Sequence, residues 1–199
     1  MRQDQQRRRL FAAAASVFSR VGYSEATAEA IAREAGMSKA TFYEHFNNKE
    51  DCIIALFDTA IDVILGAMRA AGDRSRDAEP AARVRATTEA FLAALRQFPD
   101  EAQTLLVEIV GAGPRAMARR DRVLAELAQA IDEVNREDAG LGTAPRLASL
   151  HDAFAIVGAV VELASRQIRT GEPRDIRDVE PVLERLVVGV LHEGAGAPA

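Results

Sequence analysis

Apolar residues recur at intervals of three and four along nearly the whole chain, and this spacing narrows the possible folds more than any other feature. The most regular stretch carries Leu147, Leu150, Phe154, Val157, Val161, Ala164 and Ile168. Such spacing places one apolar stripe along one side of an α-helix. No segment shows a convincing strand pattern, and no internal repeat is visible. The sequence therefore predicts an all-α protein of about nine helices.

Capping residues and helix breakers divide this pattern into segments. A first helix is expected from about residue 10 to Gly22. Thr27 and Ser38 can cap two short helices on either side of Gly36, and Asn48 with Asp51 resembles a capping box that begins a fourth helix. Further helices are expected over the apolar patterns at 84–98, 100–111, 114–134, 147–168 and 179–192, with loops at 72–80 and 137–143.

The two short helices have the spacing of a helix-turn-helix. Ile31 and Ala35 share one face of the first, Phe42 and Phe46 lie one turn apart on the second, and Met37 fills the turn. Two helices of this length cannot bury those side chains alone, so the helix before them must cover them. In this motif the second helix enters the major groove of duplex DNA.

The outward face of that second helix carries side chains suited to DNA. With the two phenylalanines inward, Lys39, Ala40, Tyr43 and Glu44 turn outward, and Thr41 and His45 lie at the flanks. Lysine can contact phosphate or guanine, and a small alanine allows close approach and can touch a thymine methyl. The alternative for each residue is an ordinary polar side chain on a small helical module.

The stretch from Leu10 to near Phe57 closely resembles the DNA-binding domain of the TetR family of bacterial transcriptional regulators. The matching residues are Gly22, Tyr23, Thr27, Ile31, Ala32, Ala35, Gly36, Ser38, Thr41, Tyr43, Phe46, Asn48, Lys49 and Glu50. The resemblance, with the helix-capping pattern, predicts DNA-binding residues at Thr27, Ser38, Lys39, Ala40, Thr41, Tyr43, His45 and Lys49. Two departures are visible, because Ala26 and Ala40 stand where the family often has threonine and glycine.

The charge is unevenly divided between this segment and the rest of the chain. The net charge is −5, yet residues 1–50 carry eight basic and six acidic side chains, and the remainder carries 17 basic and 24 acidic. A locally basic module on an acidic body should repel DNA everywhere except at one surface. The cluster Arg2, Arg7, Arg8 and Arg9 can bind phosphates or the minor groove, or it can be a solvated charged end.

The C-terminal helices offer a candidate interface with a second copy of the chain. The expected interface residues are Leu150, Phe154, Val157, Gly158, Val161, Leu183, Leu186 and Val190. A two-fold dimer doubles the few base pairs that one short helix can read, and the family resemblance implies the same arrangement. The alternative is that both helices only close the core of their own domain.

The resemblance also implies a central cavity for a small-molecule effector. Its expected lining residues are Thr88, Phe91, Leu105, Met117, His151 and Phe154. A flexible methionine and few polar groups suit an apolar or aromatic ligand. Ordinary core packing is the alternative for each of these residues.

Other functional classes find little support. His45, His151, His192 and the single Cys52 lack metal-ligand spacing, and Gly111–Pro114 is a helix break rather than a phosphate loop. We therefore expect no enzyme, no cofactor and no metal site. One cysteine fits a reducing cytoplasm, no apolar run is long enough to cross a membrane, and the polar opening does not resemble a signal peptide.

Together these features predict a cytoplasmic, homodimeric transcriptional regulator. Residues 1–48 form the expected DNA-binding domain, and residues 49–199 form the expected ligand-binding and dimerisation domain. The resemblance favours a repressor that a small-molecule effector releases from its operator, by a shift of population between two arrangements of the recognition helices. The alternative is a ligand-independent regulator, or an activator, of the same fold.

Overall fold

The computed structural model describes residues 2–194 and is helical throughout. The α-helices are α1 (Arg2–Glu25), α2 (Ala28–Glu34), α3 (Lys39–His45), α4 (Lys49–Arg74), α5 (Pro80–Gln97), α6 (Pro99–Leu106), α7 (Pro114–Gly140), α8 (Leu150–Thr170) and α9 (Glu180–Gly194). Two 3₁₀ helices, η1 (Glu108–Gly111) and η2 (Ile176–Val179), precede α7 and α9. Within the described range there is no strand, so the all-α prediction and the count of nine helices are confirmed.

Several helix ends differ from the prediction, and three of them illustrate how. Helix α1 begins at Arg2, because exposed polar residues can continue a helix without showing an apolar stripe. Helix α7 runs to Gly140, so the loop expected from residue 137 starts later; Asp138 accepts a hydrogen bond from Arg83 at 2.6 Å. Helix α8 begins at Leu150 rather than Leu147, because Ser149 and Asp152 form a capping box there.

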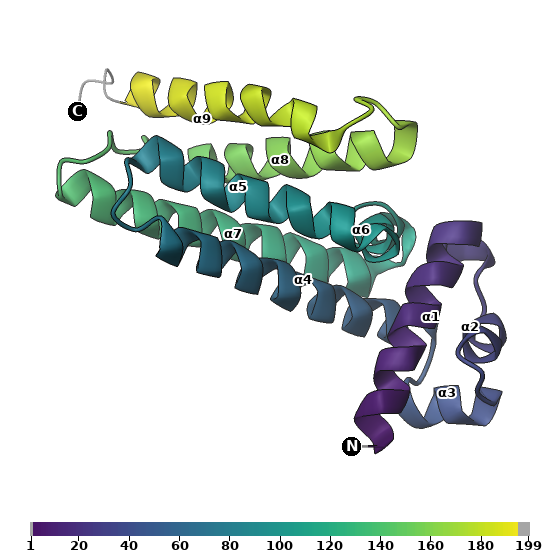
Figure 1. Cartoon of the computed structure of the whole chain (residues 1–199). Coiled ribbons are helices and arrows are strands. Elements are labelled where there is room, and N and C mark those ends of the chain that lie inside the picture. The colour runs from purple at the N-terminus through teal and green to yellow at the C-terminus, as the bar shows by residue number, and fades with distance from the viewer. Residues whose placement is uncertain (1, 195–199) are drawn as a thin grey trace. The chain divides into compact units, whose positions relative to one another are not determined.

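The turn between α2 and α3 follows the predicted capping chemistry. Thr27 Oγ1 accepts the N–H of Ala30 at 3.1 Å, and Ser38 Oγ accepts the N–H of Thr41 at 3.1 Å. Gly36 has a φ of +65°, a left-handed conformation that other residues rarely adopt. Figure 1 shows the result, with α2 and α3 side by side and α1 covering both.

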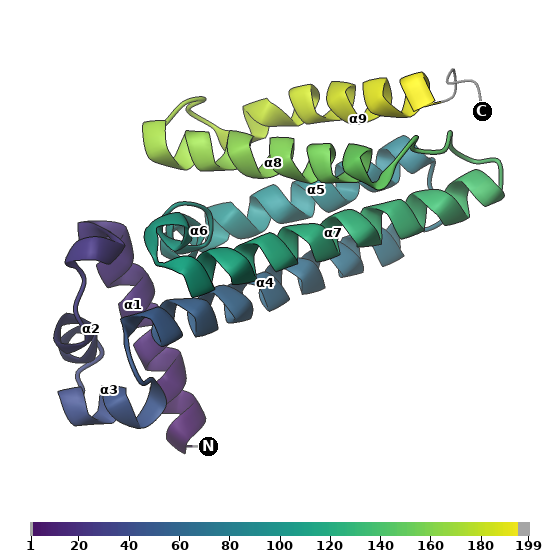
Figure 2. The same cartoon turned by 180° about the vertical axis from the view of Figure 1, so that it is seen from behind.

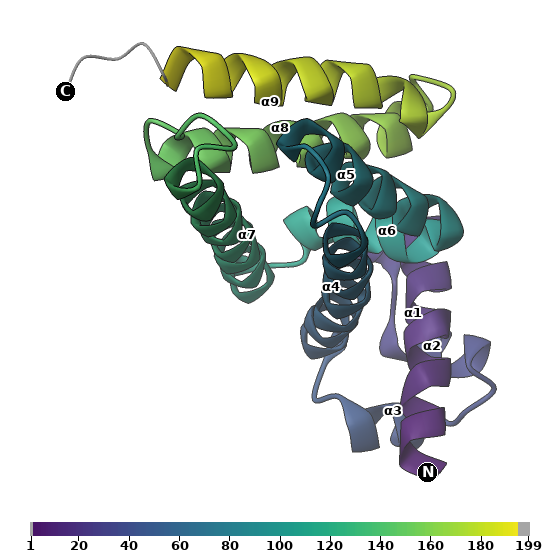
Figure 3. The ribbon, with the colours of Figure 1, turned by 60° about the vertical axis from the view of Figure 1, so that its left-hand side comes forward.

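The chain divides into two compact units. One comprises the chain up to Val63 together with Leu95–Arg120, and in it α6 and η1 pack against α1 (Figure 3). The other comprises Ile64–Ala94 and the chain from Asp121 onward. Because α4, α5 and α7 contribute residues to both, the expected boundary between residues 48 and 49 stays a prediction.

In the second unit, α8 and α9 form an antiparallel pair (Figure 2). Its core includes Ile156 and Val157 of α8, packed against α7 and α9. A buried carboxylate helps to hold the connection that precedes α8: Asp132 accepts hydrogen bonds from Arg136 of the same helix at 2.6 Å and from Arg146 at 2.7 Å. The bond from Arg146 ties this connection to α7.

Candidate nucleic-acid interface

Two phenylalanines determine which face of α3 is exposed. Phe42 has no exposed surface and Phe46 has 4%. The Phe46 ring lies 5.4 Å from the Phe42 ring and 5.7 Å from the Phe11 ring of α1, measured between centroids. Burial of these rings and of Ile31 confirms the inward face that their spacing predicts. The opposite face of α3 is therefore held toward solvent.

That outward face carries Lys39, Ala40 and Tyr43. The side chain of Lys39 is 57% exposed, Tyr43 is 50% exposed, and Ala40 is also exposed. The Lys39 ammonium lies 4.0 Å from the Glu29 carboxylate, a long and exposed ion pair. An exposed ion pair of this kind contributes little to stability. Lys39 can therefore leave Glu29 and contact a DNA phosphate at a small cost in free energy.

The predicted hydroxyl residues serve first as helix caps. Thr27 Oγ1 accepts a backbone N–H, which leaves its own proton available to a phosphate oxygen. The hydroxyls of Ser38 and Thr41 lie 3.0 Å apart and share one hydrogen bond. Ser38 and Thr27 are exposed and Thr41 is half-buried, so all three stand near the outward face of the motif.

Lys49 and His45 are placed differently from Lys39. The Lys49 ammonium donates to the carbonyls of Tyr23 at 2.6 Å and Ser24 at 3.1 Å, and lies 4.2 Å from the centre of the Tyr23 ring. Burial lowers the pKa of Lys49, with a nearby Glu25 opposing the shift. Lys49 thus ties the start of α4 to the end of α1, and a phosphate contact would compete with these bonds. His45 is half-buried beside Phe46.

The N-terminal arginines are divided between two environments. The Arg7 guanidinium lies over the Phe11 and Phe46 rings, 5.2 and 5.8 Å from their centres. Arg9 donates to the carbonyl of Ala35 at 2.6 Å. Two members of the cluster therefore stabilise the motif itself, a role that their position in the sequence did not reveal.

Contacts from α6, η1 and α7 to the motif were also missed by sequence reasoning. Glu108 of η1 accepts the N–H of Tyr23 at 2.7 Å, and Arg115 of α7 donates to Asp51 of α4 at 2.7 Å. The partners are separated by 85 and 64 residues, so no local pattern could pair them. The hydrogen bonds from Asn47 and Arg115 lower the pKa of Asp51.

The predicted effector residues come from both units, and their assignment to one cavity stays a prediction. Thr88, Phe91, His151 and Phe154 belong to the second unit, and Leu105 and Met117 belong to the first. Phe91 and Leu105 are buried, Thr88 and Met117 are half-buried, and His151 and Phe154 are exposed. The structure contains a shallow pocket of about 330 Å³ on α1 and α2, lined by Arg9, Ala12, Ala13, Ser16, Glu34 and Ala35, and none of the six lines it.

The predicted interface residues divide by exposure. Leu150 is 44% exposed and Phe154 is 46% exposed, whereas Val157 and Leu183 are 6% and 2% exposed. The last two have little exposed surface in the single chain, and their assignment to an interface stays a prediction. The half-buried members are Gly158, Val161, Leu186 and Val190.

Residues 2–194 lack two further classes of feature. No group of histidine, cysteine, aspartate and glutamate side chains in that range could hold a metal ion. None of the helices there is both long and apolar enough to cross a membrane.

Comparison with known proteins identifies the motif. Residues 10–56 match the family model described as bacterial regulatory proteins, tetR family. Residues 10–56 therefore form a TetR-family DNA-binding segment. The resemblance seen in the sequence is thereby confirmed.

Relatives of known function are all transcriptional regulators. The activator FasR of Mycolicibacterium smegmatis is 35% identical over 88 residues, which cover 44% of this chain and 39% of FasR. The regulator RutR of Escherichia coli K12 is 27% identical over 141 residues, which cover 71% of this chain and 64% of RutR. The chain therefore spans less than two thirds of the length of these relatives.

Solved structures share the fold over nearly the whole chain. The fatty acid degradation regulator FadR from Bacillus halodurans superposes with a TM-score of 0.79 at 20% identity, covering 92% of this chain and 94% of FadR. FadR from Bacillus subtilis, in complex with stearoyl-CoA, has a TM-score of 0.78 at 22% identity, covering 92% and 98%. The arrangement of a helix-turn-helix followed by a larger helical region is thus the fold of this family.

Proposed function

We propose that this TetR-family chain is a bacterial transcriptional regulator that binds duplex DNA through the outward face of α3. The observation that carries the proposal is the placement of Lys39, Ala40 and Tyr43 on one exposed face, held there by the buried rings of Phe42 and Phe46. The N-terminal part of a recognition helix reads base edges in the major groove. Its place of action is the cytoplasm, where bacterial DNA is found.

Selection of a preferred duplex from a random-sequence pool tests this proposal. The wild-type chain is expected to enrich one related set of sequences, and Lys39→Ala and Tyr43→Ala are expected to lose that binding while keeping the helical circular-dichroism spectrum. Arg122→Ala, which removes an exposed charge from α7, is the matched control and should bind as the wild type does. Equal binding by all variants would place the DNA surface elsewhere.

We propose further that the chain acts as a homodimer. Leu150 and Phe154 of α8, with Val182 of α9, are large apolar side chains that remain exposed in the single chain. One recognition helix of seven residues reads only a few base pairs, and a two-fold pair doubles the site. Val182 was not predicted; its exposure of 44% is the reason to include it.

Light scattering after size-exclusion chromatography tests the dimer. The wild type is expected to elute with twice the mass of one chain, and Phe154→Asp with the mass of one chain. Leu141→Asp is the control, because Leu141 is a 77% exposed apolar residue outside α8 and α9. A dimer that survives Phe154→Asp would require a different interface.

The regulatory step that we propose is release of a repressor from its operator by a small, largely apolar effector. The comparison that supports it is the shared fold with a regulator crystallised in complex with stearoyl-CoA. Compounds that raise the melting temperature of the chain, beginning with acyl-CoA thioesters, should weaken its affinity for the selected duplex. A compound that binds and leaves the affinity unchanged contradicts the proposed coupling.

Transcription in vitro from a promoter that contains the selected duplex separates the remaining alternatives. Addition of the chain lowers transcript yield if it is a repressor and raises it if it is an activator. The bound compound restores the yield only if the chain responds to a ligand. Absence of any DNA binding at low salt would favour an enzyme or an interaction module instead.

A further inference from the structure

The end of α2 is held by two kinds of contact, and only one of them is internal to the helix-turn-helix. The N–H of Gly36 donates to the carbonyl of Arg33 at 3.0 Å, and the N–H of Met37 donates to the carbonyl of Ala32 at 2.8 Å. These bonds form the standard left-handed ending of a helix and satisfy two of its last carbonyls. The carbonyl of Ala35, one residue before the glycine, is not part of that pattern.

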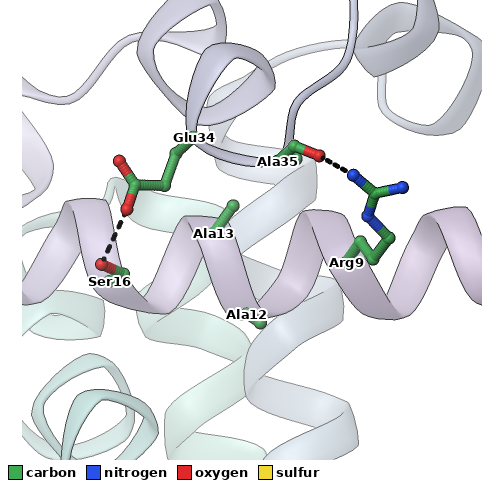
Figure 4. A pocket seen from close by; sticks show the side chains of 6 residues that line it. All are labelled: Arg9, Ala12, Ala13, Ser16, Glu34 and Ala35. Atoms are coloured by element: carbon green, nitrogen blue, oxygen red, sulfur yellow. Dashed lines mark hydrogen bonds between the residues drawn. The ribbon is translucent and has the colours of Figure 1, made fainter.

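That carbonyl accepts its hydrogen bond from α1. Arg9, 26 residues earlier in the chain, donates from Nη2 to Ala35 O at 2.6 Å (Figure 4). A cation at a helix C-terminus also interacts favourably with the helix dipole. The bond fixes the peptide plane between Ala35 and Gly36, and the turn from this plane to the start of α3 is only three residues long.

The surroundings of Arg9 place its guanidinium against the end of α2, although the residue itself is exposed. A Cβ atom on Gly36 would lie 3.1 Å from Arg9 Nη2, so the absence of a side chain there admits the guanidinium. Along the same groove, Glu34 accepts hydrogen bonds from Ser16 at 3.4 Å and Arg20 at 3.3 Å. Ala12 and Ala13 line the groove between these contacts (Figure 4), and their small side chains leave room for the end of α2.

We infer that Arg9 is a positioning residue for DNA recognition. Its hydrogen bond to the Ala35 carbonyl holds the turn before α3 and thereby sets the direction of α3. Arg9 is not itself a phosphate ligand. The inference rests on the proposed function. Phe42 and Phe46 determine how deeply α3 is buried and which face it exposes, and they lie at its middle and at its C-terminal end. The bond from Arg9 to Ala35 restrains α3 at the N-terminal end, where base contacts are made.

Salt-dependent binding separates positioning from phosphate contact. Arg9→Met is expected to weaken binding to the selected duplex about tenfold, the loss typical of one hydrogen bond to a charged donor. Binding to a scrambled duplex should change less than about twofold, and the slope of log affinity against log salt should stay at the wild-type value. A phosphate ligand would instead weaken both duplexes equally and lower the slope by about 0.9.

Arg8→Met is the matched control, because it removes the same charge from the neighbouring exposed position. Identical behaviour of the Arg8 and Arg9 variants overturns the inference. A purely structural role would lower the melting temperature of Arg9→Met and leave the ratio of selected to scrambled affinity unchanged well below that temperature, which also overturns it.

Hydrogen exchange in the free, full-length chain tests the same idea without DNA. In Arg9→Met, the amides of Gly36 and Met37 should exchange about tenfold faster than in the wild type, and those of Arg8→Met should not change. Unchanged exchange in Arg9→Met overturns the inference. Failure of the wild type to select any duplex would refute the proposed function, and this measurement would still decide whether Arg9 holds the turn.

Discussion

Replacement of Glu108 by alanine should destabilise the unit that carries the recognition helix. Helix α1 loses helical geometry at Gly22, where φ is +79°, and the next N–H, that of Tyr23, donates to Glu108 Oε2 at 2.7 Å. Glu108 Oε1 accepts a second hydrogen bond from Gln103 at 2.9 Å. Alanine removes both acceptors and leaves a partly buried backbone N–H without one.

The expected loss follows from the two bonds. Both bonds end on the Glu108 carboxylate, and a hydrogen bond to a charged group contributes about 1.5–3 kcal/mol, which gives about 3–6 kcal/mol for two. Both sites are only partly buried, so solvent lowers the expected total to about 2–3 kcal/mol, below that range. Glu108→Gln should cost less, because its amide oxygen still accepts one of the two N–H groups.

Cys52 provides the assay. It is the single cysteine of the chain, it is fully buried, and it lies in the same unit as Glu108. Its labelling rate under native conditions therefore measures opening of that unit. At a factor of ten for each 1.4 kcal/mol, Glu108→Ala should raise the rate by about 30- to 140-fold.

Two further variants make the result decisive. Phe42→Ala creates a cavity in the core of the same unit and should accelerate labelling strongly, which shows that the probe responds. Glu133→Ala removes an exposed carboxylate from α7 and should leave the rate unchanged. An unchanged rate in Glu108→Ala, together with acceleration in Phe42→Ala, would refute the reasoning.

Three other predictions concern titration. Burial raises the pKa of Cys52 to about 12, so alkylation of its thiol at pH 8 should be much slower in the folded chain than in denaturant. Hydrogen bonds from Asn47 and Arg115 lower the pKa of Asp51. The contribution of its carboxylate to stability is present above the ordinary pKa of aspartate and is lost as the pH falls through the lower pKa of the folded chain. In Asp51→Asn, the free energy of unfolding should therefore depend less on pH in the acidic range. Burial and neighbouring Glu89 raise the pKa of Glu180, which disfavours its charged form in the folded chain. Glu180→Gln should therefore raise the melting temperature at pH 7, and the gain should vanish near the ordinary pKa of glutamate.

The helix-turn-helix was predictable because its determinants are local. Thr27, Gly36 and Ser38 act on backbone groups within four residues of themselves, and the periodicity of Phe42 and Phe46 follows from helix geometry alone. Capping and turn chemistry of this kind can be read directly from a sequence.

The contacts that join this motif to later helices were not predictable in the same way. Glu108 and Arg115 are ordinary charged residues in the sequence, and their partners became neighbours only when α6 and α7 packed beside α1 and α4. Gly113 illustrates the difference. It was expected as a helix break, yet a Cβ atom there would also lie 2.8 Å from Glu50 Oε1, a close approach that only the folded chain reveals.

The internal contacts also change what the local basic charge can do. Of the eight basic side chains in the first fifty residues, Arg7, Arg9 and Lys49 contact aromatic rings or backbone carbonyls within the motif. A side chain that keeps such a contact when DNA binds displaces no counterion from the phosphates. The salt dependence of binding should therefore be smaller than the count of basic residues implies. Non-specific affinity is then expected to fall more than specific affinity, because the proposed DNA contacts of Lys39 and Tyr43 stay available. On this reasoning we expect a single copy of the chain to bind DNA weakly, so that the affinity of a regulator requires the second recognition helix of the proposed dimer.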